Sequence, residues 1–354
     1  MSEPIRLGLV GVGRAGWGMH CPEIANKTDL FKFVAACDII PERRDKMKER
    51  YGCKTYDDIH KLILDPDVEI VDIATRSCDH YAHARLALEA GKDVLLEKPF
   101  SETYAEACEL YELADKLGRK LYARHNRRFE EHFKKIRELQ KSKLLGDIYE
   151  IHITRNNYSR RDDWQTLSQF GGGQLLNWGP HIIDQSLQFL DEKATVVASD
   201  LKHTVAAGDC EDHLTIVLRG EDDTMVYMQI SGGIALPCPE YEAFGTKGSL
   251  RITGNTMHLR YLDPNDPLDP PVADPGTPGQ TFGSSGTFQN AKPIKWIEED
   301  IERAPEDLSV IWTYMYEDYR NGIPYPIKAE EALNVIKVID EVKRGTPFER
   351  KPRN

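Results

Sequence analysis

The first 123 residues alternate short apolar runs with longer stretches of helical periodicity. Strands that are separated by crossover helices in this way form a parallel sheet. The apolar runs leave no polar face, so we expect helices on both sides of that sheet. The predicted strands cover residues 6–12, 33–38, 69–74, 93–96 and 120–123. The pattern therefore predicts an α/β fold that begins with a doubly wound parallel sheet of the Rossmann type.

Glycines mark the ends of the helices between these strands. Gly52, Gly91 and Gly118 each follow a helical stretch, at the position where a left-handed residue commonly ends a helix. The helix before Gly91 has a small apolar stripe at i, i+3 and i+4, made of Ala84, Ala87 and Leu88. We expect this stripe to face the sheet.

After residue 123 the pattern changes to a charged helix over 130–143 and then to strict alternation of apolar and polar residues. The alternating apolar positions are Leu214, Ile216 and Leu218 in one stretch and Met257, Leu259 and Tyr261 in another. Such stretches are typical of antiparallel strands with one solvated face. A final helix is predicted over 329–343. Residues 263–286 are rich in Pro, Gly and Asp and lack periodicity, which predicts an irregular excursion or a mobile loop.

Composition excludes several classes of partner. The 354 residues carry a net charge of −12, which argues against nucleic acid, because non-specific affinity for phosphates comes from Lys and Arg. No uncharged run approaches the roughly 20 apolar residues needed to span a bilayer, and no basic and apolar leader follows Met1. The seven cysteines are scattered without zinc spacing and indicate buried thiols of a reducing cytosol. We expect a cytoplasmic protein with a small-molecule ligand, no membrane partner and no metal.

A glycine motif, Gly11-x-Gly13-x-x-Gly16, follows the first strand and opens a helix. In a dinucleotide site the first glycine permits the tight turn, the second admits the pyrophosphate, and the third allows close packing of helix and strand. Asp38 ends the second strand, where a carboxylate binds ribose hydroxyls and repels a 2′-phosphate. NAD is therefore predicted in preference to NADP. Arg43 and Arg44 would neutralise a 2′-phosphate unless they are surface charges of the next helix.

Ligands bind outside the carboxyl ends of parallel strands, and three polar segments follow strands there. These segments are Thr75-Arg76-Ser77, Glu97-Lys98-Pro99 and Arg124-His125-Asn126-Arg127-Arg128. A lysine beside an oxidised nicotinamide, which is cationic, should have a lowered pKa and accept a proton more readily. Lys98 is therefore a candidate base. The alternative is a surface lysine in a turn set by Pro99.

Several motifs together resemble the Gfo/Idh/MocA family of oxidoreductases over essentially the whole chain. The motifs are the three glycines after the first strand, Ala87-Leu88-Glu89-Ala90-Gly91-Lys92, Glu97-Lys98-Pro99, Gly171-Gly172-Gly173, Gly179-x-His181-x-x-Asp184 and Gly245-Thr246-Lys247-Gly248-Ser249-Leu250. The resemblance implies an NAD(P)-binding Rossmann domain at 1–123 and a substrate-binding and oligomerisation domain at 124–354. The second domain should contain a large, open, mostly antiparallel sheet, through which members often form homo-oligomers.

The resemblance also implies catalytic roles for two residues. Lys98 matches the catalytic lysine of the family, and His181 matches a histidine that often serves with it as acid and base. The family commonly has an aspartate four residues before this histidine, where the present chain has Asn177. Asn177 can orient a hydroxyl but cannot take a proton. Asp184 shares a helix face with both and either orients the imidazole or caps the helix.

The remaining candidate residues surround these two. The resemblance and the glycine motif place Gly11, Gly13, Arg14, Ala15, Gly16, Asp38, Thr75, His80, Glu97 and Lys98 at the cofactor, although His80 could equally cap its own helix. Facing the substrate, beside Asn177 and Asp184, we expect Arg127, Asn157 and Trp164. Trp178 is either a platform for a sugar ring or a packing residue. Arg160 and Arg161 suit an acidic sugar or phosphate unless they pair with Asp162 and Asp163.

The function that follows is an NAD-dependent dehydrogenase acting on a ring alcohol or ketone of a sugar, glycoside or cyclitol. NADP is the less favoured cofactor, and a homodimer or homotetramer is expected. One alternative is a glycosidase that retains its NAD, oxidises C3 transiently and eliminates the aglycone. A second alternative, favoured by Asn177, is a dinucleotide-binding sensor without turnover.

Overall fold

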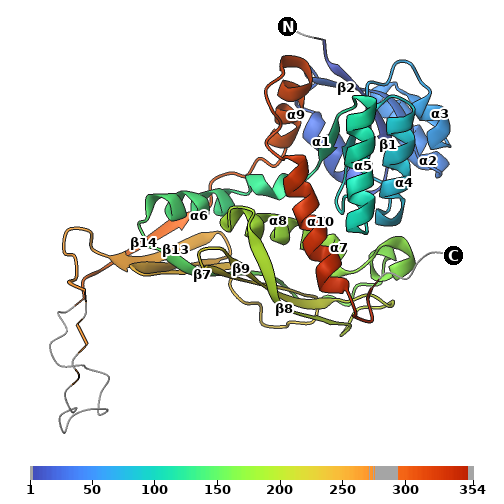
Figure 1. Ribbon diagram of the computed structural model, residues 1–354. Coiled ribbons are helices and arrows are strands. Elements are labelled where there is room, and N and C mark those ends of the chain that lie inside the picture. Colours follow the sequence, from blue (N-terminus) through green and yellow to red (C-terminus); the bar gives the residue numbers. More distant parts are fainter. Residues whose placement is uncertain (1–2, 271, 274, 276–293, 350–354) are drawn as a thin grey trace.

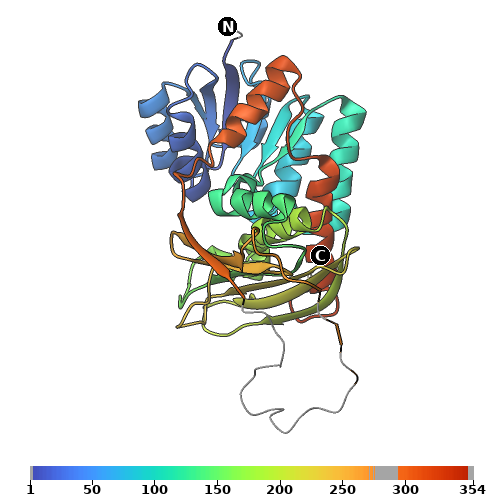
Figure 2. The same ribbon diagram turned by 90° about the vertical axis from the view of Figure 1, so that its left-hand side faces the viewer.

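The computed structural model describes residues 3–270, 272, 273, 275 and 294–349 and contains two β-sheets with helices packed between them (Figure 1). The chain completes the first sheet before it enters the second. The polypeptide is therefore an α/β protein in which a parallel sheet and a mostly antiparallel sheet lie on opposite sides of a layer of helices (Figure 2).

The first sheet, sheet A, is parallel and has the strand order β3-β2-β1-β4-β5-β6. Its strands are β1 (Ile5–Val10), β2 (Phe31–Cys37), β3 (Lys54–Tyr56), β4 (Ile70–Ile73), β5 (Asp93–Leu96) and β6 (Leu121–Ala123). Every residue of β4 and β5 is buried, because both faces of the sheet are covered. All five predicted strands are present. Edge strand β3 was not predicted, since its three residues contain no apolar run.

Helices connect these strands, and three of them end at the glycines that the sequence analysis identified. They are α1 (Cys21–Ile24), α2 (Pro41–Tyr51), α3 (Ile59–Ile63), α4 (His80–Glu89) and α5 (Tyr104–Leu117). Gly52, Gly91 and Gly118 have φ of +62°, +78° and +62°, which confirms the left-handed positions. Ala84, Ala87 and Leu88 of α4 are fully buried, so the predicted sheet-facing stripe is confirmed.

The second sheet, sheet B, has the order β14-β13-β12-β11-β7-β10-β9-β8. Its strands are β7 (Ile148–Asn156), β8 (Ala194–Lys202), β9 (His213–Gly220), β10 (Met225–Ser231), β11 (Tyr241–Gly245), β12 (Gly248–Thr253), β13 (Thr256–Leu262) and β14 (Trp296–Glu302). All neighbouring strands are antiparallel except β7 and β10. The predicted alternation in β9 and β13 is confirmed, because its apolar positions are buried.

Helices cover one face of sheet B and separate it from sheet A (Figures 1 and 2). They are α6 (Glu131–Ser142), α7 (Gln174–Asn177), α8 (Gly179–Phe189) and α10 (Ala329–Lys343). Helix α10 has the predicted bounds, and α6 falls within the predicted range. On the opposite face of the sheet, Tyr227 and Thr215 are only partly buried. Sheet B therefore has one packed face and one open face.

One helix returns from the second half of the chain to sheet A. Helix α9 (Val310–Asn321) buries Trp312 completely and places its ring 5.5 Å from Phe31 of β2, edge to face. Asp318 of α9 pairs with Lys120 at 2.5 Å beside β6. The division of the chain at residue 123 stays a prediction. Helix α9, although it lies near the end of the chain, packs against the first sheet.

Two further expectations concern loops and cysteines. Most of the predicted irregular segment 263–286 lies outside the described residues. The expectation that all seven cysteines are buried is wrong for Cys238, which is exposed in the loop before β11, and for Cys78 and Cys108, which are only partly buried. Among the residues that the structure describes, none of the helices has the length and apolar character required to cross a bilayer.

Candidate active site

A cleft of about 920 Å³ opens at the carboxyl ends of the strands of sheet A. One wall, the sheet A wall, consists of residues that follow β1, β2, β4 and β5, together with Arg124 after β6. The other wall, the sheet B wall, consists of Asn126 and Arg127 and of residues between β7 and the start of α8. This is the edge at which open parallel sheets bind ligands.

The glycine loop forms one end of the cleft. Gly11 has φ +94°, and a Cβ there would lie 2.6 Å from the carbonyl oxygen of Ala74. A Cβ on Gly16 would overlap the carbonyl oxygen of Gly11. A Cβ on Gly13 would meet only the Arg43 guanidinium, at 3.6 Å. The loop therefore packs tightly behind and leaves its backbone accessible in front, as a pyrophosphate requires.

Asp38 lies at the rim beside this loop. Its carboxylate accepts hydrogen bonds from the backbone N–H groups of Val12, at 2.8 Å, and Ile40, at 2.9 Å. Arg43 approaches the same carboxylate at 3.3 Å. A fixed carboxylate at the end of β2 and an accessible glycine backbone fit a nicotinamide dinucleotide. Arg43 next to Asp38 leaves the choice between NAD and NADP open.

Lys98 lies in the middle of the cleft, directly after β5. Its Nζ donates to the backbone oxygen of Asn177 at 2.9 Å and to Asn177 Oδ1 at 3.3 Å. Burial lowers the pKa of Lys98 to about 8; Glu97 opposes this change, and Arg127, Arg14 and Arg124 add to it. A substantial fraction of the amine is therefore neutral near pH 8 and able to accept a proton.

Glu97 lies behind Lys98. Its Oε2 accepts the backbone N–H of Lys98 at 3.0 Å, and its Oε1 accepts Arg124 Nη1 at 2.7 Å. Burial disfavours the carboxylate, but the charge of Arg124 and the contact with His20 outweigh burial and keep the pKa of Glu97 well below its usual range. Glu97 is thus a buried anion that is fixed next to the candidate base.

His181, on the first turn of α8, lines the same cleft from the opposite wall. Burial, Lys98 and Arg127 hold the pKa of His181 well below its usual range, so the ring is neutral at physiological pH. Its Nδ1 has no hydrogen-bond partner among the described residues. A neutral imidazole can donate from one nitrogen and accept at the other.

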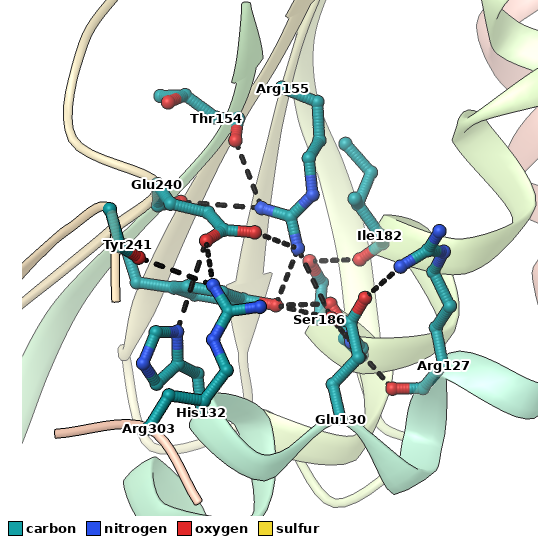
Figure 3. A network of polar contacts seen from close by, with 12 residues as sticks. Arg127, Glu130, His132, Thr154, Arg155, Ile182, Ser186, Glu240, Tyr241 and Arg303 are labelled. Atoms are coloured by element: carbon teal, nitrogen blue, oxygen red, sulfur yellow. Dashed lines mark hydrogen bonds and ion pairs between the residues drawn. The ribbon is translucent and has the colours of Figure 1, made fainter. Parts of the chain in front are cut away.

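The sheet B wall is backed by the charged network of Figure 3. Arg127 stacks on Trp178, with its guanidinium 4.4 Å from the ring centroid, and pairs with Glu130. Glu130 also contacts Arg155 at 3.2 Å, and Arg155 donates to Tyr241 at 2.8 Å. Both Arg127 and Arg155 lie within 6 Å of the ring centroid of Trp178, which also lines the cleft.

Nearby, Arg161 is already paired. Its guanidinium contacts both carboxylate oxygens of Asp163 at 2.8 Å and also reaches Gln165. Gln165 in turn donates to Asn177 Oδ1 at 3.3 Å. For Arg161, the structure therefore agrees with the alternative given above, in which the arginine pairs with a neighbouring aspartate.

Most of the sequence-derived candidate residues line one cleft. They are Gly11, Gly13, Arg14, Ala15, Asp38, Thr75, His80, Glu97, Lys98, Arg127, Trp164, Asn177 and His181. Gly16 packs behind the loop. The ring of His80 is buried and donates from Nδ1 to the carbonyl oxygen of Pro99 at 2.7 Å. This contact orients the ring under the cleft.

Besides Gly16, two candidates do not line the cleft. Asp184 is 1 % exposed and accepts hydrogen bonds from Arg128 Nε, at 2.9 and 3.1 Å, and from Arg128 Nη2, at 2.6 Å, so its carboxylate is directed to that guanidinium. Asn157 is exposed, and its backbone continues the sheet by donating to Ser231 at 3.0 Å. Sequence reasoning named the adjacent Trp164 but did not find Gln165, because no motif includes this glutamine.

Comparison with known proteins agrees with this geometry. Residues 5–125 match the family described as "Oxidoreductase family, NAD-binding Rossmann fold", and residues 133–251 match the "GFO/IDH/MocA C-terminal domain". The chain is 28% identical over 361 residues to scyllo-inositol 2-dehydrogenase (NADP(+)) IolW of Bacillus subtilis (strain 168), covering 98% of this chain and 95% of that protein. It is 30% identical over 196 residues to D-glucoside 3-dehydrogenase of Escherichia coli (strain K12), covering 53% and 55%.

A solved structure has the same fold. The putative oxidoreductase yvaA from Bacillus subtilis superposes with a TM-score of 0.79 at 21% identity, covering 97% of this chain and 96% of that one. The combination of a parallel and a mostly antiparallel sheet is therefore shared along the full length.

Proposed function

The chain belongs to the Gfo/Idh/MocA family of oxidoreductases, and on this premise we propose that it is a nicotinamide-dependent dehydrogenase of a neutral sugar, glycoside or cyclitol. The observation that carries the proposal is Lys98, a lysine with a pKa of about 8 in the cleft that the glycine loop opens. Residues 1–123 then form the cofactor domain and residues 124–354 the substrate domain.

The residues of the cleft have different roles in the proposed reaction. When bound, a nicotinamide dinucleotide supplies the hydride acceptor or donor. Lys98 takes the proton of the reacting hydroxyl group in the oxidative direction and returns it in the reductive direction. Asn177 holds Lys98 Nζ in place without adding a charge. His181 offers a neutral ring that hydrogen-bonds the same oxygen.

Charge pairing on the sheet B wall supports a neutral substrate. Arg127 is paired with Glu130, and Arg161 with Asp163, so an anionic substrate would have to replace an existing carboxylate at either position. Two relatives have names that refer to scyllo-inositol and to a D-glucoside, both polyhydroxylated and uncharged. This favours neutral polyols over sugar acids and sugar phosphates.

For the cofactor we propose NAD before NADP. Asp38 presents a carboxylate at the ribose end of the cleft, where it accepts hydroxyl groups and repels a phosphate. Arg43 partly compensates this charge at 3.3 Å, which makes the preference moderate in size. We further propose a cytoplasmic homo-oligomer in which the open face of sheet B is covered by a second copy of the chain.

A screen of neutral sugars, glycosides and inositols with NAD tests the proposal. Reduction of NAD by at least one neutral polyol, and loss of that reaction in Lys98→Met, is expected. Aglycone release without net NADH would instead select the NAD-retaining glycosidase. Binding of NAD without any turnover would select the sensor. A substrate preference for sugar acids would contradict the neutral class.

A further inference from the structure

A buried cluster of charged residues lies beneath Lys98, and from it we infer that His20 is a positioning residue, which keeps Lys98 a proton acceptor by supplying a fixed positive charge behind Glu97. This inference rests on the proposed function, because it concerns the base of that reaction. His20 does not line the cleft and does not touch the substrate side.

The backbone turns His20 inward through an unusual helix. Residues Gly16–His20 (η1) form a π-helix at the start of the segment that follows the glycine loop. Such wide turns are rare and occur often at functional sites. The turn ends on His20, whose side chain is fully buried.

His20 is held by two carboxylates from neighbouring strands. Its Nδ1 donates to Asp72 of β4 at 2.8 Å, and its Nε2 donates to Glu97 at 2.9 Å, immediately after β5. Two N–H donors facing two carboxylates require the imidazolium form. Burial alone would lower the pKa of His20, but Asp72 and Glu97 outweigh burial and raise it to about 9.

A second cation completes the cluster. Arg124, which follows β6, binds Glu97 at 2.7 Å and also pairs with Glu23 of α1. Glu23 accepts Trp312 Nε1 of α9 at 2.6 Å, and the Trp312 ring packs edge to face on His20 at 5.5 Å. The cluster therefore has two cations, His20 and Arg124, and three carboxyl groups, Glu23, Asp72 and Glu97.

The charges balance only when Lys98 is counted. The five groups, of which Glu23 is only partly buried, carry one negative charge in excess, and the Lys98 ammonium neutralises it. A neutral residue at position 20 would leave two negative charges in excess, since Arg124 still keeps Glu97 ionised. The ammonium form of Lys98 would then be favoured and its pKa would rise.

The other groups around Lys98 and His20 leave Glu97 as the carboxylate that acts on the amine. Those facing Lys98 are Glu97, Arg124, Arg127, Arg14, Asn177 and His181, and those facing His20 are Asp72, Glu97, Arg124 and the Trp312 ring. Among these, Glu97 is the only carboxylate next to Lys98. Its position is fixed by His20 on one side and Arg124 on the other.

Competitive acetylation measures this effect without any substrate. The full-length protein is treated with trace acetic anhydride between pH 6 and 10.5, and modification of Lys98 is quantified by mass spectrometry against an internal amine standard. Wild type should show a midpoint near pH 8 for Lys98. His20→Gln and His20→Asn should each raise this midpoint by about one unit. His60→Gln, an exposed histidine of α3, is the matched control and should leave it unchanged.

A double variant separates charge from packing. His20→Gln with Asp72→Asn removes one cation and one carboxylate together, so the Lys98 midpoint should return to within about 0.3 unit of wild type. An unchanged midpoint in the single variants overturns the inference, as does a fall. An equal rise in the double variant also overturns it, since the effect would then be structural. If the single variants do not fold, a double variant that folds with a wild-type midpoint supports the inference, and one with a shifted midpoint refutes it.

This test is independent of the proposed function. A Lys98→Met protein that still turns over would refute the role of Lys98 as base, whereas the acetylation midpoint reports only on the charge around the amine. Where a substrate is known, the acidic limb of kcat/KM should move with the acetylation midpoint in the same variants.

Discussion

The two walls of the cleft are each backed by buried ion pairs, but the ion pairs serve different ends. Beneath Lys98 on the sheet A wall, carboxyl groups outnumber cations, and the amine on the surface neutralises the excess. On the sheet B wall, the arginines Arg127, Arg155 and Arg303 all contact Glu130 or Glu240 (Figure 3). The first arrangement leaves an excess of negative charge next to the amine, and the second pairs each of these arginines with a carboxylate.

The comparison shows that burial of charge does not by itself indicate chemistry. Burial opposes ionisation of Glu240, but His132, Arg155 and Arg303 outweigh burial and lower its pKa, so it is ionised like Glu97. What differs is the neighbour that faces the cleft. Glu97 lies next to a lysine that can lose its proton near neutral pH, whereas Glu130 and Glu240 lie next to arginines that cannot.

The largest effect is expected from Lys98→Met, which removes the proton acceptor and keeps the apolar stem. We expect kcat to fall by about 10²–10⁴-fold, the usual contribution of a general base. Affinity for NAD, measured by fluorescence titration, should change little. Arg127→Met on the other wall is the matched comparison and should act mainly on KM. A kcat within tenfold of wild type for Lys98→Met would contradict the assignment.

The second prediction concerns stability and the sheet B wall. Glu130→Ala removes the carboxylate that pairs with both Arg127 and Arg155 and leaves Arg155 only its ion pair with Glu240 at 3.2 Å, which should lower the free energy of unfolding by about 3 kcal/mol. Glu131→Ala, one residue further on, removes only a surface pair with Lys134 and should cost about 0–1 kcal/mol. Chemical denaturation of both variants provides the comparison. Equal losses would mean that the sheet B network does not stabilise the fold.

The geometry of the two walls explains which of their residues could be predicted from the sequence to meet. Glu97, Lys98 and Arg124 each follow a parallel strand, and parallel strands end at one edge, so their meeting could be predicted. Glu130, Arg155 and Tyr241 come from a loop, from β7 and from β11, which no local pattern relates. His20 was missed because a π-helix changes the direction of its side chain.

Prediction of the fold from the sequence is limited in the same way. Strands β4 and β5 were predicted from continuous apolar runs, and β9 from alternation, because burial on two faces or one leaves these patterns. Helix α9 was missed, since its first turn consists of β-branched and aromatic residues with low helix propensity, including Val310 and Trp312. Packing against sheet A stabilises it instead.

A smaller effect is expected from Asn177→Asp. Asn177 belongs to the sheet B wall and accepts hydrogen bonds from Lys98 on the sheet A wall. The new carboxylate would lie about as close to Lys98 Nζ as Asn177 Oδ1 does, at 3.3 Å. An adjacent negative charge stabilises the ammonium form, so the pKa of Lys98 should rise from about 8 by about one unit. Because the neutral amine is the active form, the acidic limb of kcat/KM should move to higher pH. A profile that coincides with wild type would place Asn177 outside the proton path.

The smallest effect is expected at Asp38, where the sheet A wall contains an arginine with incomplete pairing. Arg43 approaches Asp38 at 3.3 Å, and this carboxylate already accepts two backbone N–H groups, whereas Arg127 on the opposite wall is paired with Glu130. Asp38→Ser removes the repulsion of a 2′-phosphate and leaves Arg43 free to bind it. The ratio of NADP to NAD affinity should rise by about fivefold, or about 1 kcal/mol, in a fluorescence titration of both dinucleotides. Asp147→Ser, at an exposed residue outside the cleft that pairs with Lys143, is the control. A rise of similar size in the control would mean that general loss of negative charge, and not release of Arg43, determines the preference.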